Sequence, residues 1–498
     1  MAHTSQTFAI SSIDLGIAKD EEYRKTLSRE VYFSAEKEMR TRLYEDIVSP
    51  LDDTGSEWTC EIEDLRPEII RLLEPYLARI DKRKPAKVPA FTLAFPPDNT
   101  PPASKARRIP FHLQEEVKTL IDELLDLDFI SPSKSPFAAP IVLARRGNGQ
   151  LRLCCDFTRL NRISPNDQYP ILRQDSLFTA LSGKTVFGAL NLRRGYFNIE
   201  VAEPTKHITA FITPWGLYQW NRMPFGLKTA PAHFQRCINS IFKDLVPCAC
   251  LIYLDDILVF GKDNVEFLTN LKRVLDRLAD FNFCLNLAKC KIGMHKVKYL
   301  GFIISGEGRK IDSKKLGDLR SLTLPSSLKV VQRMIGKLNY LREFIPDYSR
   351  SAEPITRIMK KPYKKTAWGS EQSQAWNNIL TQLERRLTLC HASPEGKFIV
   401  RTDAASNSGI GGILIQVDPL GKERLINLFA RKFNRTETRW STYEQEQGLT
   451  LEGVLSVPCS GADVERFFSR FSFIYSPQRE SLETSNAFVL SALMFNLN

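Results

Sequence analysis

Two adjacent aspartates, Asp255 and Asp256, stand in the otherwise apolar run CLIYLDDILVFG at residues 250–261. An isolated ionised carboxylate is costly to bury unless another group pairs with it. The apolar arms predict two strands joined by a tight turn, with both carboxylates at a sheet edge. Neighbouring carboxylates repel each other, so the pair favours a divalent cation, and hard oxygen ligands favour Mg²⁺ or Mn²⁺. The alternative is a plain Asp-rich hairpin turn without a metal.

The charge of the chain is concentrated in its middle. The 498 residues carry a net charge of +12, and residues 81–446 hold 56 Lys/Arg against 35 Asp/Glu. Residues 1–80 and 447–498 hold more acidic than basic side chains. A surplus of this size over a folded region favours a nucleic-acid partner.

Other classes of protein are disfavoured by the residue patterns. The ten cysteines and six histidines do not show the paired spacing of a zinc site. No run reaches the ~18 apolar residues that a membrane span needs, and the N-terminus lacks a secretory signal pattern. We therefore expect an intracellular protein, cytoplasmic or nuclear, without a membrane partner.

Strand-like runs alternate irregularly with amphipathic helical runs, which predicts an α+β or mixed α/β fold of several domains. Residues 84–110 are rich in proline and predict an extended lead-in outside the core, and residues 213–234 predict a loop. The expected strands are 140–145, 151–155 and 185–191, and the expected helices are 117–125, 264–285 and 329–342.

Tyr253, Leu254, Asp255 and Asp256 resemble the catalytic box of reverse transcriptases, and the surrounding chain resembles that of gypsy-type LTR retrotransposons. The resemblance covers roughly residues 85–446. The segments that carry it, in the order expected for the family, are SPFAAPIVLARR (135–146), LRLCCDFTRLNR (151–162), LNLRRGYFNIEV (190–201), MPFGLKTAPAHFQR (223–236), KYLGFIIS (298–305) and GKLNYLREFIP (336–346).

The resemblance implies a right-hand polymerase of fingers, palm and thumb. Such an enzyme adds deoxynucleotides, taken from deoxynucleoside triphosphates, to a primer on an RNA or DNA template with the help of two Mg²⁺ ions. Asp255 would be the main metal ligand of the hairpin and Asp256 a supporting one. The implied domains are an acidic helical or linker segment (1–83), fingers and palm (84–305), thumb and connection (306–395), a partial RNase H-like segment (396–446) and a helical tail (447–498).

The partner carboxylate of this family comes from an LDLxxGY-type motif, and this chain has Asn191 where the family has aspartate. An amide offers a neutral oxygen to a cation and no charge. If the lost anion removes ~4 kcal/mol of transition-state stabilisation, the rate falls about a thousandfold. We therefore expect a weakened or inactive polymerase.

The other family positions hold the expected residue types. Tyr196 matches the aromatic residue that stacks under the sugar and excludes a ribose 2′-hydroxyl, and Phe225 matches a residue lining the nucleotide pocket. Arg145, Arg146 and Arg152 match fingers residues that grip the incoming triphosphate. The alternative is that the aromatics belong to the core and the arginines to a solvated hairpin tip.

Residues 398–416 resemble the first strand pair of the RNase H domain that follows these polymerases. Asp403 matches its first catalytic aspartate and Glu446 its next catalytic carboxylate. Hydrolysis of an RNA strand also uses two metal ions and needs further aspartates downstream, so we do not expect RNase H activity.

From 447 the sequence departs from the polymerase family. Residues 460–495 resemble the C-terminal dimerisation region of hAT-type transposases, which implies a homodimer through 447–498. An ordinary amphipathic helix pair is the alternative. Three hypotheses follow: a weakened or inactive RNA-directed DNA polymerase, a non-catalytic nucleic-acid-binding protein, and an interaction protein that pairs through its tail.

Overall fold

The computed structural model describes most of the chain between residues 58 and 431 and two short pieces beyond it. The described residues are 58–96, 99–145, 151–169, 178–193, 195–322, 325, 327–359, 368–385, 387–393, 397–405, 409–431, 439 and 471–473. The chain divides into two compact units, Met1–Gly306 and Glu307–Asn498. Helices and sheets are mixed in both units, which confirms the predicted α+β class.

Unit 1 contains two larger sheets. The first has the strand order β1-β6-β5-β2-β3, in which only the β2–β5 pair is parallel. The second is antiparallel throughout and has the order β7-β8-β4-β9. The strands are β1 (Ile130–Pro132), β2 (Ala139–Arg145), β3 (Leu151–Cys155), β4 (Val186–Asn191), β5 (Phe211–Thr213), β6 (Gly216–Trp220), β7 (Cys250–Tyr253), β8 (Asp256–Gly261), β9 (Lys291–Met294), β10 (Lys296–Tyr299) and β11 (Phe302–Ser305).

The helices of unit 1 are α3 (Arg66–Arg79), α4 (Gln114–Asp126), α5 (Thr158–Ile163), α7 (Glu203–Lys206), α8 (Ala230–Ile241) and α9 (Asn264–Asp280). Its single-turn 3₁₀ helices are η2 (Glu63–Leu65), η3 (Phe111–Leu113), η4 (Phe178–Leu181), η5 (Gly195–Asn198), η6 (His207–Thr209) and η7 (Leu287–Lys289). α9 begins where the side chain of Asp263 accepts a hydrogen bond from the Glu266 amide. Its apolar face, which includes Phe267, Leu271 and Val274, is fully buried.

The elements that the sequence predicted in unit 1 are present: strands 140–145, 151–155 and 185–191 correspond to β2, β3 and β4, helix 117–125 to α4, and helix 264–285 to α9, which ends at Asp280. Several shorter elements, among them β1, β5, β9 and α5, were not predicted. Residues 213–234, predicted as a loop, contain β6 and the first turns of α8. The prediction was wrong because β6 is short and only its last residue, Trp220, is buried, so its apolar signal is weak. α8 begins at Ala230, directly after its N-cap Thr229, and Pro231 occupies the first turn of the helix, where proline is tolerated.

The lead-in at 84–110 is extended, as predicted, but it contributes to the core. Phe91 forms a bridge with Val201 and is almost completely buried, and Leu93 and Ile109 are buried as well. A proline-rich segment has few backbone N–H donors, so it can be buried when each donor has an acceptor. The backbone N–H of Phe91, for example, donates to the Glu200 carbonyl.

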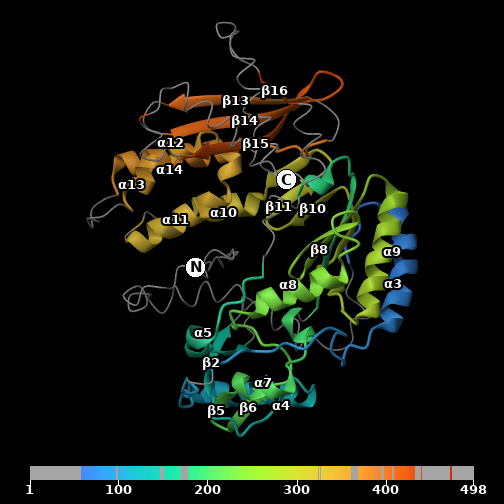
Figure 1. Ribbon diagram of the computed structural model, residues 1–498, viewed down its shortest axis with the longest axis vertical. Helices are drawn as coiled ribbons and strands as arrows, with labels where there is room; N and C mark the ends of the chain where they lie inside the picture. The colour runs from blue at the N-terminus through green and yellow to red at the C-terminus, as the bar shows by residue number, and fades with distance from the viewer. Residues whose placement is uncertain are drawn as a thin grey trace. The chain divides into compact units, whose positions relative to one another are not determined.

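α3 packs along α9, and the two helices run side by side in Figure 1. The buried residues of α3 are Ile69, Leu73 and Tyr76, which join the same hydrophobic core as the β7-β8-β4-β9 sheet. The segment from residue 58 onward is therefore built into the core of unit 1. The domain boundary at 83 stays a prediction.

Unit 2 begins with the strand β12, continues with a series of helices and ends in a sheet. Its elements are β12 (Gly308–Ile311), α10 (Ser313–Arg320), α11 (Leu328–Tyr340), η8 (Arg342–Phe344), α12 (Tyr348–Ser351), α13 (Glu353–Arg357), α14 (Ser370–Glu384), β13 (Lys397–Ala405), β14 (Gly409–Val417), β15 (Glu423–Arg431) and β16 (Phe471–Phe473). α12 packs against β14 and β15 (Figure 1). The sheet has the order β15-β14-β13-β16, with β16 parallel to β13.

Within the described part of the chain, no helix combines the length and the apolar character that crossing a membrane requires.

Candidate active site

The two aspartates lie where β7 turns into β8. β7 and β8 pair antiparallel with Tyr253 opposite Asp256, and Leu254 and Asp255 form the turn. This confirms the predicted strand pair and tight turn. β8 lies between β7 and β4 in the sheet, so Asp256 stands at the end of an inner strand, and the expected position at a sheet edge was wrong.

Asn191 ends β4 directly opposite Asp256. The two residues face each other in the antiparallel β4–β8 register. The side-chain nitrogen of Asn191 donates a hydrogen bond to Oδ1 of Asp256 at 3.0 Å. The backbone N–H of the following residue, Leu192, donates a hydrogen bond to the backbone carbonyl of Asp255 at 3.0 Å. Two segments more than 60 residues apart are thus brought together at the position that the sequence predicted.

The donor set at this sheet end is two carboxylates and one neutral amide. Among the residues that the structure describes, no group of three or more His, Cys, Asp or Glu side chains is arranged to hold a metal ion. The amide nitrogen of Asn191 also occupies one oxygen of Asp256. A pair of divalent cations is normally bridged by several anions, so the residues present fit a two-ion site poorly.

Tyr299, at the end of β10, lies beneath the second aspartate. Its hydroxyl donates to the backbone carbonyl of Asp256 at 3.5 Å, and its ring is buried. Burial raises the pKa of Tyr299 well above its ordinary value, and the negative charges of Asp256 and Asp255 raise it further. The hydroxyl therefore stays protonated and can act only as a neutral support of the turn.

Gln235, on the buried face of α8, is a site residue that sequence reasoning missed. Its side-chain oxygen accepts a hydrogen bond from the backbone amide of Leu254 at 2.8 Å. The detectable signal was an amide placed among apolar residues of one helix face, beside Phe234 and Ile238. A buried polar side chain on such a face needs a partner, and here the partner is the aspartate turn.

Tyr196, predicted to stack under the sugar, and Phe225, predicted to line the nucleotide pocket, are in contact. Tyr196 belongs to η5, five residues beyond Asn191, and its ring centroid lies 4.7 Å from that of Phe225. Tyr196 also contacts Phe234 of α8 and is buried, whereas Phe225 is half-buried. The structure brings the pair together as packed aromatics, a geometry that suits the core reading, and their role toward a nucleotide stays a prediction.

The turn that holds Phe225 is braced by Asn161 of α5. The side chain of Asn161 donates to the Gly226 carbonyl at 2.7 Å and accepts from the Lys228 amide at 3.0 Å. Gly226 has φ +92°, a backbone conformation that favours glycine. Two opposed hydrogen bonds to one amide side chain hold this turn in a single conformation.

The three arginines predicted to grip a triphosphate belong to the β2–β3 pair or to the segment between its strands. Arg145 ends β2 opposite Leu151, and Arg152 lies on β3 opposite Ala144. The side chains of Arg145 and Arg152 are not described, and Arg146 lies outside the described residues. Their role also stays a prediction.

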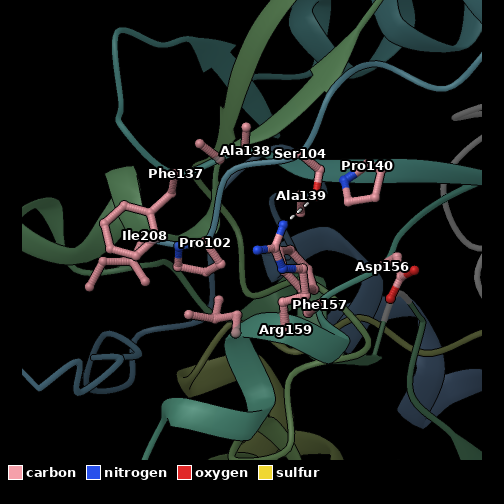
Figure 2. Close-up of a pocket in the computed structure, with 12 residues that line it drawn as sticks. Pro102, Ser104, Phe137, Ala138, Ala139, Pro140, Asp156, Phe157, Arg159 and Ile208 are labelled. Atoms are coloured by element: carbon pink, nitrogen blue, oxygen red, sulfur yellow. Dashed lines mark hydrogen bonds between the residues drawn. The ribbon is translucent and has the colours of Figure 1, made fainter. Parts of the chain in front are cut away.

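Arg159 is one of the residues that line a pocket beside the β2–β3 pair (Figure 2). Arg159 donates to the Ala103 carbonyl at 2.7 Å and reaches toward the Ser104 hydroxyl at 3.4 Å. None of the predicted site residues lines this pocket. The guanidinium ties the lead-in to α5, which makes its role structural.

The described parts of residues 398–416 form the predicted antiparallel pair, β13 and β14, with Asp403 opposite Gly411. The side chain of Asp403 is not described, and Glu446 lies outside the described residues. Of the tail 447–498, only β16 is described, so the predicted helical dimerisation region stays untested.

Comparisons with known proteins agree with this geometry. Residues 144–304 match the family described as reverse transcriptase (RNA-dependent DNA polymerase), and residues 368–451 match the RNase H-like domain found in reverse transcriptase.

Two curated relatives show how much of a longer protein the chain covers. The chain is 34% identical over 405 residues to the retrovirus-related Pol polyprotein from transposon opus of Drosophila melanogaster, covering 77% of this chain and 39% of the relative. It is 30% identical over 326 residues to the transposon Tf2-3 polyprotein of Schizosaccharomyces pombe, covering 66% of this chain and 24% of the relative. The chain therefore spans well under half the length of these relatives.

Among solved structures, a foamy viral protease-reverse transcriptase in complex with double-stranded DNA has a TM-score of 0.71 at 20% sequence identity, covering 83% of this chain and 79% of that one. At this identity the likeness concerns the fold alone. It confirms the predicted polymerase fold.

Proposed function

Since the chain carries a reverse transcriptase domain followed by an RNase H-like domain of the kind found in retrotransposon Pol polyproteins, we propose that it is a gypsy-type RNA-directed DNA polymerase whose transfer step is weakened by Asn191. The observation that carries the proposal is the 3.0 Å hydrogen bond from Asn191 to Asp256. It puts an amide where a third carboxylate would complete the site.

The weakening follows from charge. Phosphoryl transfer builds negative charge on the phosphate oxygens, and an active site of this class offsets it with divalent cations held by carboxylates. With one anion fewer, a loss of ~4 kcal/mol in transition-state stabilisation corresponds to a rate about a thousandfold lower. The two aspartates alone do not supply the missing ligand.

The substrate contacts are part of the proposal. Arg145, Arg146 and Arg152 would bind the triphosphate of an incoming deoxynucleotide, since the guanidinium fork matches phosphate oxygens. Tyr196 and Phe225 would bound the sugar and base, and their mutual contact supports a shared surface. Tyr196 is buried and packs against both Phe225 and Phe234, so its ring has to become more exposed before it can meet a sugar.

A second function, binding of primer–template without synthesis, is favoured by the charge distribution. The surplus of 21 positive charges over residues 81–446 is independent of Asn191 and suits a phosphate backbone. The solved relative named above was determined in complex with double-stranded DNA. The affinity of binding to a phosphate backbone increases as the salt concentration falls.

Primer extension on an RNA template, with Mg²⁺ or Mn²⁺, tests the proposal. We expect Asn191→Asp to raise the rate by on the order of a hundredfold to a thousandfold, and the matched Asn191→Ala variant to stay at or below the natural chain. A well-folded Asn191→Asp protein that gains nothing contradicts the role given to this position. Gel-shift binding of the same primer–template, measured over a salt series, separates a protein that binds without synthesis from one that does neither.

A further inference from the structure

The turn that carries Asp255 is held from below by a side chain outside the predicted site. Leu254 adopts φ +53°, in the left-handed region that is unfavourable for a residue with a branched side chain. Its backbone amide donates to the side-chain oxygen of Gln235 at 2.8 Å. Gln235 is only 2% exposed, so this acceptor replaces water for the Leu254 amide.

From Gln235 the hydrogen bonds continue along α8 to Asn239 and from there to Tyr169. The side-chain nitrogen of Gln235 donates to the Asn239 oxygen at 2.7 Å, and the Asn239 nitrogen donates to the Tyr169 hydroxyl at 2.9 Å. The direction of the chain of bonds is fixed at one end. The Leu254 amide can only donate, so Gln235 must turn its oxygen to the turn and its nitrogen to Asn239. Because the side-chain oxygen of Asn239 accepts from Gln235, its side-chain nitrogen must be the atom that points toward the Tyr169 hydroxyl.

The three hydrogen bonds from Leu254 through Gln235 and Asn239 to Tyr169 form a relay. Its Tyr169 end is held against α8 by Arg236. Arg236 donates to both carboxylate oxygens of Asp167, at 2.7 and 2.8 Å, and its guanidinium lies 4.9 Å from the ring centroid of Tyr169. The Tyr169 amide donates to the same Asp167 carboxylate at 3.0 Å. Asp167 and Tyr169 thus form one unit on the helix, held by a charge-assisted pair and a ring contact.

We propose that Gln235 and Asn239 are positioning residues that couple the Asp167–Tyr169 segment to the aspartate turn. The turn is more than 80 residues from that segment in sequence, and the two are joined by three consecutive side-chain hydrogen bonds. Loss of the Tyr169 hydroxyl leaves the Asn239 nitrogen without its acceptor. Asn239 then holds Gln235 less firmly, and the hydrogen bond from the Leu254 amide to Gln235 is weakened. For its effect on synthesis, this inference rests on the proposed function.

Hydrogen exchange measured by mass spectrometry on the full chain tests the coupling without any need for activity. We expect Tyr169→Phe and Asn239→Leu to speed amide exchange in a peptide covering residues 251–257 by on the order of threefold to tenfold, the range for one net hydrogen bond. Tyr218→Phe removes a hydroxyl from a ring of the five-stranded sheet that packs on Phe211, and it should leave that peptide unchanged. Equal acceleration in a peptide from α9 would mean general loosening and overturn the proposal.

A double-mutant cycle separates coupling from simple structural support. If the coupling depends on Gln235, Tyr169→Phe does not change amide exchange in the peptide 251–257 any further in a protein that already carries Gln235→Met. Additive effects of the two changes overturn the relay. In the Asn191→Asp background, Tyr169→Phe should lower kcat for primer extension and leave KM for the primer–template unchanged. If that background makes no product, the proposed function fails, while the exchange result still decides the coupling.

Discussion

The amide nitrogen of Asn191 lies 3.0 Å from Oδ1 of Asp256, on facing residues of β4 and β8. The bond satisfies both groups without a cation, because a neutral donor and a carboxylate form a favourable pair where two carboxylates would repel. The contact to which we attribute a weakened active site therefore also stabilises the sheet end that carries it.

Asn191→Asp should lower the free energy of unfolding in the absence of divalent cations. It removes the hydrogen bond and places two carboxylates side by side, a loss of about 1–3 kcal/mol. Mn²⁺ or Mg²⁺ should restore the stability, since a cation that binds only the folded state stabilises it by mass action. Thermal unfolding with and without the cation measures both effects.

The matched control for this prediction is Asn191→Ala, which also loses the hydrogen bond but adds no charge. It should be destabilised and should not regain stability with Mn²⁺. A natural chain that responds to Mn²⁺ as strongly as the aspartate variant would show that the two existing carboxylates suffice to hold the ion.

Sequence reasoning found the aspartate turn and its partner strand because their signals are local. The apolar arms around Asp255 and Asp256 have the length of two strands, and Asn191 ends a third apolar run. Both faces of β4 and β8 are buried over most of their length, so the burial pattern alone does not set their register. The facing of Asn191 and Asp256 was expected from the resemblance, which assigns both positions to one catalytic site.

The supports of the turn were not predictable in the same way. Gln235 and Tyr299 reach the turn from elements that sequence does not place next to it, and their polar atoms gain meaning only from those neighbours. Burial of Phe91 was missed for a related reason, since a proline-rich segment carries no periodicity to mark an inward face.

Tyr76→Phe should destabilise unit 1 by about 1–3 kcal/mol, because two buried backbone groups lose their partner. The Tyr76 hydroxyl donates to the Phe283 carbonyl and accepts from the Leu285 amide, each at 2.8 Å. Leu285 in turn forms a bridge with Leu192, next to Asn191. Denaturant unfolding measures the loss, which would show that α3 supports the candidate site.

The control on the same helix is Arg71→Ala. Arg71 pairs with Glu68 at the surface, and exposed pairs of this kind contribute little. A Tyr76→Phe protein as stable as Arg71→Ala would mean that water reaches the Phe283 and Leu285 groups and that α3 is only loosely attached.

His233 should make unit 1 less stable in mild acid. Its ring packs edge-on against Phe91 and its Nε2 lies 3.2 Å from the Pro89 carbonyl. Burial lowers the pKa of His233 below its usual 6.5, and the nearby Arg236 lowers it further, while the Pro89 carbonyl opposes the shift. The unfolded chain therefore binds the proton first.

Its contribution to stability is complete above pH 6.5 and is lost as the pH falls toward the depressed folded-state pKa. Unfolding free energies between pH 5 and pH 8, compared for the natural chain and His233→Gln, should show a shallower slope in the variant in the range just below pH 6.5. Identical slopes would assign the acid sensitivity to other groups.

The tail strand β16 should protect the RNase H-like sheet from association. Phe471, Ser472 and Phe473 pair in parallel with Phe398, Ile399 and Val400 of β13. In the described part of the chain, a variant ending at residue 470 leaves β13 as an edge strand with unpaired amides and carbonyls, and such edges pair with other chains. We expect this variant to show a higher mass by light scattering, rising with protein concentration.

A variant ending at residue 476 keeps β16 and is the matched control, which should behave like the full chain. The resemblance of the tail to a dimerisation region makes the opposite prediction, that shortening converts a dimer to a monomer. The direction of the change in mass thus distinguishes a strand that closes its own sheet from a segment that joins two chains. Equal masses for all three proteins would contradict both.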